Sequence, residues 1–396
     1  MLITMGYFKI STISTAPTAY TAIYIIILGG KMRLKIKQED IVKLINISQR
    51  AVSSKSSVQI LEGILFIAQN NRLKLISTDM ETTIETSIDC MVEEDGEIVI
   101  NSSLFGDIVK KLPRDTVNIN TKGTDVEIIC GKSQFYLNGQ LSDNFPLSPK
   151  LSDEDLSFNI KGEDLINSVR RTGFATSTDL KRPQLNGIFL EMKENNLRFV
   201  AIDGYRLAIS DIETDGKGNM EAIVQKKALE EFTKIINEDS DVQVKKSESH
   251  ILLESGDTKM FSRLIDKKYL DYEIILKMDV TSEIVVNKIK FQNAIERASL
   301  LLRDGKVNLV KLAIKDDNIN ISSNSEIGTS NEDIACKIKG PGLNIAFNAR
   351  YLTEGLRAID SEEIVIKANG SLDPMKIYPK DDESYVYLVL PVRVGN

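Results

Sequence analysis

The sequence predicts an α+β protein made of three similar domains in tandem, each with two helices packed against antiparallel sheets. Blocks of similar sequence recur about every 122 residues, and each block alternates short apolar strands with amphipathic helices. The length agrees, because 396 residues at roughly 150 per domain allow two or three domains. Solenoid repeats are shorter, about 20–45 residues, so these units are expected to be globular.

Each unit opens with a short strand and an amphipathic helix. The opening segments are KIKQEDIVKLINISQRAVSS from Lys35, NIKGEDLINSVRRTGFATS from Asn159 and VVNKIKFQNAIERASLLLR from Val285. Two or three alternating strands follow, joined by polar turns, and then a second strand, a second helix and further strands. The six helices are expected over residues 38–55, 102–114, 163–172, 226–236, 288–303 and 349–358.

Equivalent positions in the three units set the spacing of the repeat. Leu73, Leu197 and Ile319 are 124 and 122 residues apart, and a second set begins with Val99 and Val224, which are 125 apart. Independent positions that give one spacing indicate a true internal repeat.

The domain boundaries follow from this spacing and from the linker composition. The domains are expected at residues 32–150, 151–277 and 278–396, with linkers near 146–155 and 277–281.

Residues 1–31 differ from the rest of the chain, since they contain no acidic residue and carry an apolar run from Ala22 to Leu28. That run is too short to span a membrane, which takes about 20 apolar residues. The segment is expected to be an extension outside the working chain, either disordered or a mis-assigned start. A signal peptide is the alternative, because Lys9 precedes the apolar run.

Composition excludes several classes of protein. With 42% apolar and 27% charged residues the chain is typical of soluble globular proteins, not of disordered chains or multi-span membrane proteins. Three cysteines, Cys90, Cys130 and Cys336, lie far apart and are expected to be inert core thiols in a reducing, cytoplasmic compartment. One histidine, His250, and no CxxC motif leave no zinc signature.

The charge is distributed unevenly along the sequence. The net charge is −7, yet the six predicted helices together carry 17 basic and 9 acidic residues, which leaves about −15 for the remainder. Basic residues late in helices also complement the helix dipole, which is the simpler explanation. The alternative is a basic helical layer on one face that holds a polyanion through its phosphates, without base readout.

Catalytic signatures are absent from the sequence. It contains no GxxxxGK[ST], GxGxxG or GxSxG motif. The acidic pairs Glu39–Asp40, Glu163–Asp164 and Glu362–Glu363 are expected to stabilise helix starts or turns, with a metal-dependent nuclease as the alternative. His250 lies in an alternating strand pattern without a nucleophile partner.

Two segments resemble the bacterial DNA polymerase III beta subunit, the sliding-clamp family. They are RPQLNGIFLEMKENNLRFVAIDGYRLAIS, from Arg182 to Ser210, and the C-terminal YLVLPVRV, from Tyr387 to Val394. The similarity extends over residues 32–396, whereas residues 1–31 have no counterpart in the family. The resemblance implies domains of the DNA-clamp type that close as a head-to-tail homodimer into a six-domain ring around duplex DNA, with the helices inside.

The resemblance also implies the function and the partners. The chain would be a non-catalytic processivity factor that needs no cofactor and no metal. It would bind double-stranded DNA independently of sequence and tether the replicative polymerase alpha subunit. The clamp loader and other clamp-motif proteins of replication and repair would be further partners, and no membrane would be involved.

Basic positions of the family's DNA-contacting surface map onto this chain. Family positions and one adjacent loop residue match Lys55, Lys110, Lys226, Lys227 and Arg182. Lys111, beside Lys110 late in the same predicted helix, is assigned with this set, and Arg303 and Arg350 are added from helix position alone.

The family's partner pocket lies between the second and third domains. It is expected to be an apolar slot with a charged rim. By position it comprises Leu185, Ile202, Gly204, Arg206, Leu207, Leu270, Ile275, Leu388, Leu390, Pro391, Val392 and Arg393. The chain departs from the family at two places. The family often has proline where this chain has Leu270, and methionine where it has Leu390 or Val392. Such a slot suits a short peptide with hydrophobic anchors, although each side chain could also be ordinary core.

The family's subunit interface implies contacts between Phe135 and Leu137 on an edge strand and Leu300 and Leu301 on a helix of the second copy. Phe135 and Leu300 could instead be buried within one chain.

Two other functions remain open at this point. One is a secreted three-domain β-rich binding protein, supported only by the N-terminal apolar run, and the other is a nucleic-acid-processing enzyme that uses the acidic pairs.

Overall fold

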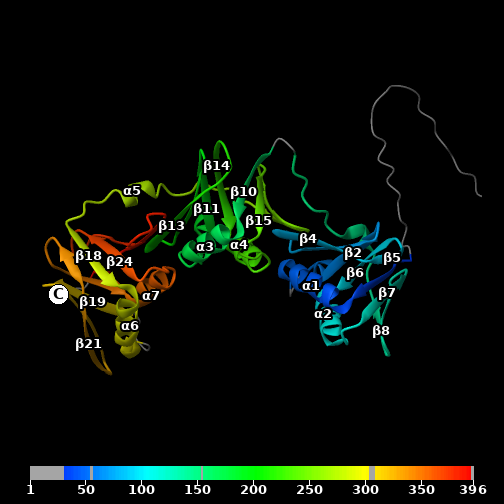
Figure 1. The fold of residues 1–396 in the computed structure, drawn as a ribbon, viewed down its shortest axis with the longest axis horizontal. Coiled ribbons are helices and arrows are strands. Elements are labelled where there is room, and N and C mark those ends of the chain that lie inside the picture. The colour runs from blue at the N-terminus through cyan, green and yellow to red at the C-terminus, as the bar shows by residue number, and fades with distance from the viewer. Residues whose placement is uncertain (1–30, 54–56, 153–154, 303–307, 394–396) are drawn as a thin grey trace, which may run out of the picture.

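The computed structural model describes residues 31–53, 57–152, 155–302 and 308–393. Three modules follow one another along an arch, from blue and cyan through green to yellow and red (Figure 1). Helices α1, α3, α4 and α7 line the concave side, and α2 and α6 lie nearer the two ends of the arch (Figure 1).

The described residues of the first module form two α-helices and nine strands. These elements are β1 (Arg33–Lys37), α1 (Gln38–Ser48), β2 (Gly63–Gln69), β3 (Arg72–Thr78), β4 (Thr82–Asp89), β5 (Met91–Glu94), β6 (Gly96–Asn101), α2 (Ser102–Lys111), β7 (Thr116–Lys122), β8 (Asp125–Cys130) and β9 (Ser133–Asn138).

The second module repeats this order with one strand fewer. Its elements are β10 (Leu156–Lys161), α3 (Gly162–Gly173), β11 (Gly187–Lys193), β12 (Asn196–Ile202), β13 (Arg206–Glu213), β14 (Asn219–Gln225), α4 (Lys226–Thr233), β15 (Asp241–Lys246), β16 (His250–Ser255) and β17 (Thr258–Arg263).

A connector that contains the short helix α5 leads to the third module. The elements are α5 (Glu273–Leu276), β18 (Ser282–Asn287), α6 (Lys288–Ser299), β19 (Leu309–Lys315), β20 (Asn318–Ser325), β21 (Gly328–Ala335), β22 (Lys337–Lys339), β23 (Leu343–Asn348), α7 (Ala349–Arg357), β24 (Glu363–Ala368), β25 (Met375–Pro379) and β26 (Tyr385–Val389).

Asparagine residues begin three of the helices. The side chains of Asn101, Asn287 and Asn348 accept hydrogen bonds of 3.0 Å from backbone N–H groups in the first turns of α2, α6 and α7. Such caps satisfy donors that have no partner within the helix. All six helices expected from the sequence are present, but α1 and α6 end earlier and continue as single 3-10 turns.

The α-helix α2 stops at Lys111 because Pro113 follows, although the sequence pattern suggested a helix to residue 114. The short helix α5 was not expected from the sequence.

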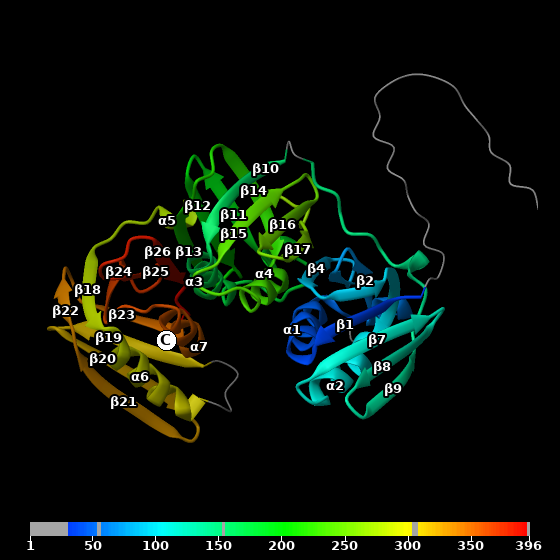
Figure 2. The same ribbon diagram turned by 45° about the vertical axis from the view of Figure 1, so that its right-hand side comes forward.

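Two large sheets run across the module boundaries. The eight-stranded sheet joins modules one and two where β4 pairs with β17, and the nine-stranded sheet joins modules two and three where β13 pairs with β26. The blue β4 and the green β17 lie side by side in Figure 2. A five-stranded sheet ending in β9 and a four-stranded sheet ending in β21 remain at the two ends of the arch.

The strand register corrects one repeat position. Leu65 pairs with Val99 in the first module, and the equivalent Phe189 pairs with Ile223 in the second. Val99 therefore corresponds to Ile223, and the pairing of Val99 with Val224 inferred from sequence was wrong by one residue. Both positions are apolar in both modules, so composition alone could not fix the register.

Each module has its own apolar core between helices and sheet, with fully buried aromatic side chains such as Phe105, Phe232 and Phe291. The outer sheet faces of the first two modules are also apolar, and the connectors that follow them cover these faces. Phe145 covers the first, and Tyr269 and Tyr272 cover the second.

In the third module the equivalent positions carry the polar pair Lys311–Ser322, where the first two carry Leu65–Ile76 and Phe189–Val200. This outer face is therefore compatible with water without a covering segment.

Candidate nucleic-acid interface and partner pocket

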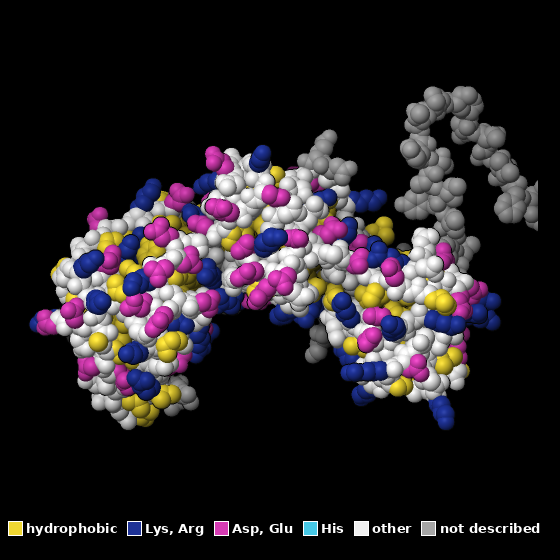
Figure 3. Space-filling model, in the orientation of Figure 1, with side chains coloured by type: hydrophobic (Ala, Val, Ile, Leu, Met, Phe, Trp, Pro, Cys, Tyr) yellow, Lys and Arg dark blue, Asp and Glu magenta, His cyan; other side chains and the backbone are white. Residues whose placement is uncertain are grey.

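The concave surface of the arch carries the basic side chains of the helices. Lys and Arg, in dark blue, gather along this edge below the middle module (Figure 3). Of the predicted DNA-contacting residues, Lys55 and Arg303 lie outside the described residues. Lys110 and Lys111 are exposed in the last turn of α2, and the Lys110 Nζ donates to Gln49 Oε1 at 2.9 Å.

Other predicted cations are held by carboxylates within the chain. Lys226 lies 3.5 Å from Glu230, and Lys227 lies 3.1 Å from Asp79 of the first module. Because both lysines reach solvent and surface pairs contribute little free energy, these lysines can exchange a carboxylate for a phosphate at small cost.

Arginines of the predicted set are paired as well. Arg182 Nε lies 3.2 Å from Asp179 in a loop, and Arg350 Nε donates to Glu354 Oε1 at 2.7 Å in α7. Arg350 remains 70% exposed, so its guanidinium is accessible from solvent.

The set of DNA-contacting residues predicted from the sequence did not include two further exposed lysines. Lys43 in α1 and Lys290 in α6 are exposed, and neither forms an ion pair among the described residues. Their positions on predicted helices could have identified them, since Arg350 was assigned from helix position alone.

The structure brings most predicted pocket residues together. Leu185, Ile202, Leu207 and Leu388 belong to one apolar cluster at the boundary of modules two and three, with Ile275 and Leu390 packed against it. Pro391 and Val392 are half-buried, whereas Arg393 is exposed. The Val392 N–H donates to Ala346 O at 2.8 Å, which holds this segment along the edge of β23.

The buried members form the floor of the cluster. Leu185 and Leu207 are 0% and 1% exposed, so the alternative of ordinary core holds for them, and a charge placed at Leu207 would unfold the module locally. Leu270 is 43% exposed and can contact a partner directly. Tyr269 was not predicted as part of this cluster. Its ring stacks on Phe189 with centroids 4.6 Å apart, and burial raises the pKa of its phenol.

Arg206 was expected at a charged rim, but it is 6% exposed and lies beneath the surface. Its Nε donates to Asp203 Oδ2 at 3.0 Å, its Nη2 to Phe174 O at 2.7 Å and its Nη1 to Glu354 of the third module. The guanidinium also lies over the Tyr351 ring, 4.6 Å from the centroid. A buried charge requires such partners, so Arg206 joins two modules.

The turn that carries Arg206 occurs in two modules. Asp203 accepts from the N–H groups of Tyr205 and Arg206, and Asp79 accepts from those of the two equivalent residues in the first module. The second turn residue is Gly204 with φ +95° in one case and Met80 with φ +74° in the other. Glycine adopts this conformation freely, whereas methionine is strained in it.

The predicted interface residues are not buried within the chain. Phe135 on the edge strand β9 is 38% exposed and Leu137 is half-buried. Leu300 and Leu301 follow α6, where Leu300 is 52% exposed and Leu301 half-buried. Strand β9 and helix α6 lie in the two end modules of the arch, so these two pairs of residues do not contact each other within one chain (Figure 2).

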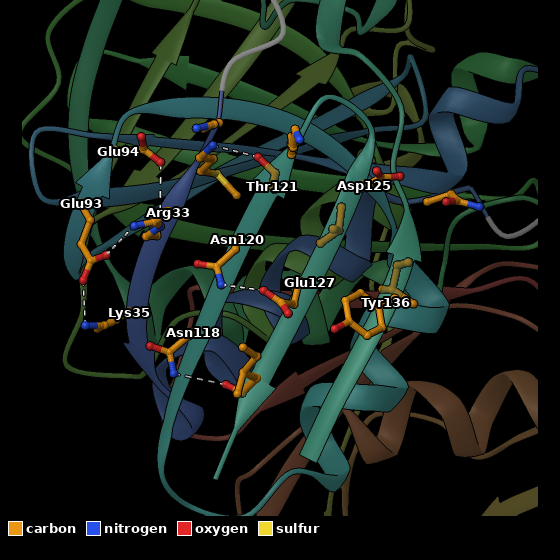
Figure 4. A pocket seen from close by; sticks show the side chains of 17 residues that line it. Arg33, Lys35, Glu93, Glu94, Asn118, Asn120, Thr121, Asp125, Glu127 and Tyr136 are labelled. Carbon is orange, nitrogen blue, oxygen red and sulfur yellow. Dashed lines mark hydrogen bonds and ion pairs between the residues drawn. The ribbon is translucent and has the colours of Figure 1, made fainter. Parts of the chain in front are cut away.

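The outer face next to β9 is polar. A hollow of about 950 Å³ extends over β1, β7, β8 and β9, and Asn120, Glu127 and Tyr136 point into it (Figure 4). Asn120 Nδ2 donates to Glu127 at 2.9 Å, and Gln134 donates to the other Glu127 oxygen at 2.6 Å. These two hydrogen bonds lower the pKa of Glu127 and keep it ionised.

In the part of the chain that the structure describes, the remaining titratable groups form no catalytic cluster. His250 Nδ1 lies 2.9 Å from Ser249 Oγ, and burial lowers its pKa. Burial raises the pKa of the Cys90 thiol to about 11. Among the described residues, no group of three or more His, Cys, Asp or Glu could hold a metal ion. Over the same residues, no helix has the length and apolar character to cross a membrane.

Repeated modules joined edge to edge through their sheets, with basic helices on one side, define the DNA-clamp architecture. Three family models of the DNA polymerase III beta subunit match in order: the N-terminal domain over residues 32–149, the central domain over 159–271 and the C-terminal domain over 274–393. The chain therefore belongs to the DNA polymerase III beta subunit family, the bacterial sliding clamps.

Individual relatives agree. The chain is 35% identical to the beta sliding clamp of Bacillus subtilis, over 91% of this chain and all of that protein, and 33% identical to the clamp of Staphylococcus epidermidis over 91% and 99%. It superposes on the crystal structure of the B. subtilis clamp with a TM-score of 0.90, at 34% identity over 92% of this chain and all of the other.

A Pseudomonas aeruginosa clamp, bound to griselimycin in its crystal structure, gives a TM-score of 0.89 at 26% identity over 92% of this chain and all of that one. The chain is thus a non-catalytic processivity factor of DNA replication, related to proteins that act with DNA and its polymerase. These relatives give no support to the secreted binding protein.

Proposed function

We propose that two copies of the chain close head to tail into a six-module ring that encircles duplex DNA. The strand order supports this most strongly. Strands β9, β17 and β26 end equivalent hairpins, and β4, β13 and β21 are equivalent strands that follow β3, β12 and β20. Inside the chain β4 pairs with β17 and β13 with β26, which leaves β9 and β21 as open edges.

The same pairing between copies would continue the pattern. Joined through β21 and β9, the four- and five-stranded end sheets would form a nine-stranded sheet, the size of the sheet between modules two and three. An open strand edge has unpaired backbone groups that favour such an extension.

The internal junctions also give the register. Thr86 pairs with Thr258 at the first junction and Ser210 with Tyr385 at the second, and the equivalent residues at the seam would be Glu332 and Ser133. Gln134 would then face Asn331 on the outer side of the sheet.

On the inner side of the seam, Phe135 would face Ser330, and Leu137 would face Gly328. A Cβ on Gly328 would lie 3.8 Å from Leu301 Cδ1, so Leu137 would enter a space next to that leucine. The predicted interface residues Phe135, Leu137, Leu300 and Leu301 fit this arrangement. Phe135 and Leu300 would lose their exposed apolar surface to the partner.

The basic helices would face the DNA. Phosphate contacts by lysine and arginine hold a duplex without reading its sequence, as a sliding protein requires. We assign this role to Lys55, Lys110, Lys111, Arg182, Lys226, Lys227, Arg303 and Arg350, and add Lys43 and Lys290.

The apolar cluster between modules two and three would take up a short peptide with hydrophobic anchors from partner proteins. The replicative polymerase alpha subunit, the clamp loader and other clamp-motif proteins are the expected partners, in the cytoplasm. The exposed Leu270 and the half-buried Leu390 and Val392 would form the contacting surface above the buried floor.

Retention on DNA of different topology tests the proposed function. The chain is loaded by a clamp loader with ATP onto a nicked circular plasmid, and half of the sample is then linearised. The protein should stay with the circle during gel filtration and be lost from the linear form. Equal loss from both forms would rule out encirclement.

A further inference from the structure

Glu354 connects the two functional surfaces of the proposed clamp. Its Oε1 accepts a hydrogen bond of 2.7 Å from Arg350, which faces solvent in the first turn of α7. Its Oε2 accepts from the buried Arg206, on the turn that borders the partner pocket. One carboxylate therefore serves two arginines that belong to different sites.

The environment of Glu354 keeps it charged. Burial alone would raise the pKa of this carboxyl, but the hydrogen bonds from Arg350 and Arg206 outweigh burial and hold it below its ordinary value. The Glu354 side chain is 22% exposed, that of Arg206 6% and that of Arg350 70%. Of the two arginines only Arg350 can leave Glu354 for a ligand from solvent, because Arg206 is enclosed.

Arg206 is in turn tied to the pocket. The Asp203 carboxylate binds its Nε and also accepts from the N–H groups of Tyr205 and Arg206. The carbonyl of Tyr205 accepts from the N–H of Leu390, a predicted pocket residue, at 2.8 Å. The position of the guanidinium therefore determines how firmly this turn is held against the C-terminal segment.

We propose that Glu354 is a shared counter-ion that couples DNA contact to the partner pocket. When a DNA phosphate takes Arg350, the Glu354 carboxylate is left to Arg206 alone, and the Asp203–Arg206 turn is held more tightly. Since coupling between two binding equilibria is reciprocal, a ligand that requires the tightened turn favours the phosphate contact of Arg350. Glu354 is thus a positioning residue, and this inference rests on the proposed DNA and partner roles.

Glu354→Gln separates this coupling from a simple change in surface charge. The matched control is Glu296→Gln in α6, because Glu296 binds Arg357 at 2.8 Å and its partners, Gln292 and Arg357, do not include Arg206. Each substitution removes one acidic charge and releases one exposed arginine, Arg350 in the first case and Arg357 in the second. Both should raise the affinity for a short duplex at low salt by about threefold, the size expected from one exposed ion pair.

Only the turn distinguishes the two variants. Hydrogen–deuterium exchange of the Tyr205 and Arg206 amides is measured in the full chain, with and without the duplex. The duplex should slow this exchange at least twofold in the unsubstituted chain and in Glu296→Gln, but leave it unchanged in Glu354→Gln. A third variant, Arg350→Ala, should still bind the duplex through the other helices and likewise show no slowing.

Equal slowing in Glu354→Gln, or no slowing in the unsubstituted chain while the duplex binds, would overturn the coupling and leave the proposed function intact. Failure of every variant to bind the duplex would overturn the proposed function, and the coupling with it. Circular dichroism confirms that each variant is folded.

Discussion

Arg206 lies at the junction of the second and third modules, where its side chain is 6% exposed. The motif DGYR placed it beside the pocket, but two carboxylates, a carbonyl and two aromatic rings enclose its charge. Alternation along a strand predicts which face a residue occupies. It does not predict what covers that face, because the covering helix α7 lies about 150 residues away in the sequence.

Arg206→Ala should therefore affect stability first. Removing the cation leaves Asp203 without its cationic partner and Glu354 with Arg350 alone, and loss of one member of a buried pair costs about 3–5 kcal/mol. Urea denaturation measures the change. The control Arg182→Ala removes an exposed pair with Asp179 and should cost less than about 1 kcal/mol. Equal losses would contradict the buried junction.

Acid should weaken the same junction. The pKa of Glu354 lies below its ordinary value of 4.5 in the folded chain, so its contribution to stability is present above that value. The contribution is lost as the pH falls through the lower folded pKa, when the carboxylate is protonated. Glu354→Gln should thus be less stable than the unsubstituted chain at pH 7, and this difference should shrink towards pH 3. A difference that stays constant with pH would argue against the ionised carboxylate.

Met80 offers a test of backbone strain. Its φ of +74° is costly for a side chain, and 60% of the side chain is exposed, so little packing is lost on removal. Met80→Gly should raise the free energy of unfolding by about 0.5–1 kcal/mol, after the greater freedom of glycine in the unfolded chain is considered. Gly204→Ala, at φ +95° in the equivalent turn, should lower it. A lower free energy of unfolding in both variants would show that packing of the Met80 side chain stabilises the fold.

Among the elements, helices were the easiest to predict and their ends the hardest. Apolar spacing located α2, α6 and α7 from sequence, and in the structure an asparagine caps the start of each. The last residues of α1 and α6 tighten into 3-10 turns, which carry the same amphipathic signal as an α-helix. The connectors were expected as plain linkers, because the apolar outer faces that Phe145 and Tyr269 cover become apparent only when the sheet register is known.

The proposed strand pair between copies can be tested by disulfide formation. Gln134→Cys with Asn331→Cys, in a Cys90→Ser background, places two thiols directly opposite one another across β9 and β21. Opposed residues have Cα atoms about 4.5–5.5 Å apart, within disulfide reach. Mild oxidation should yield a covalent dimer on a non-reducing gel.

A shifted pair provides the control for this experiment. Gln134→Cys with Asp333→Cys keeps both thiols on the outer face but offsets them by two residues, about 7–8 Å apart, and should cross-link poorly. Preferential cross-linking of the shifted pair would disprove the register, and no cross-linking of either pair would disprove the seam.

At the scale of the whole molecule, the uneven distribution of charge was predictable from the sequence, but the pairing of its basic side chains with carboxylates was not. Counting charges by predicted helix separated basic helices from an acidic remainder. The count included Glu230 and Glu354, which pair with Lys226 and Arg350, but not Asp79 of the neighbouring module, which pairs with Lys227. The inner surface is therefore less positive than the sequence suggests, which suits a protein that must slide.

Lys110→Ala with Lys111→Ala should weaken binding to duplex DNA and reduce its salt dependence. Each phosphate contact contributes about 0.9 to the slope of log K against log salt, so the slope should fall by about 2. The control Lys315→Ala with Lys339→Ala removes the same charge from sheet strands, where both side chains are at least 80% exposed. A fall in slope of the same size in the control would exclude a specific role for the α2 lysines.

The two connectors, residues 139–155 and 264–281, are of similar length, and each leads from a last hairpin strand to the first strand of the next module. In the proposed ring, a segment from β26 of one copy to β1 of the second copy would correspond to these connectors. Fusing two chains through a tether of that length should therefore give one polypeptide that closes on itself, a topology in which one seam becomes permanent and the other alone can open.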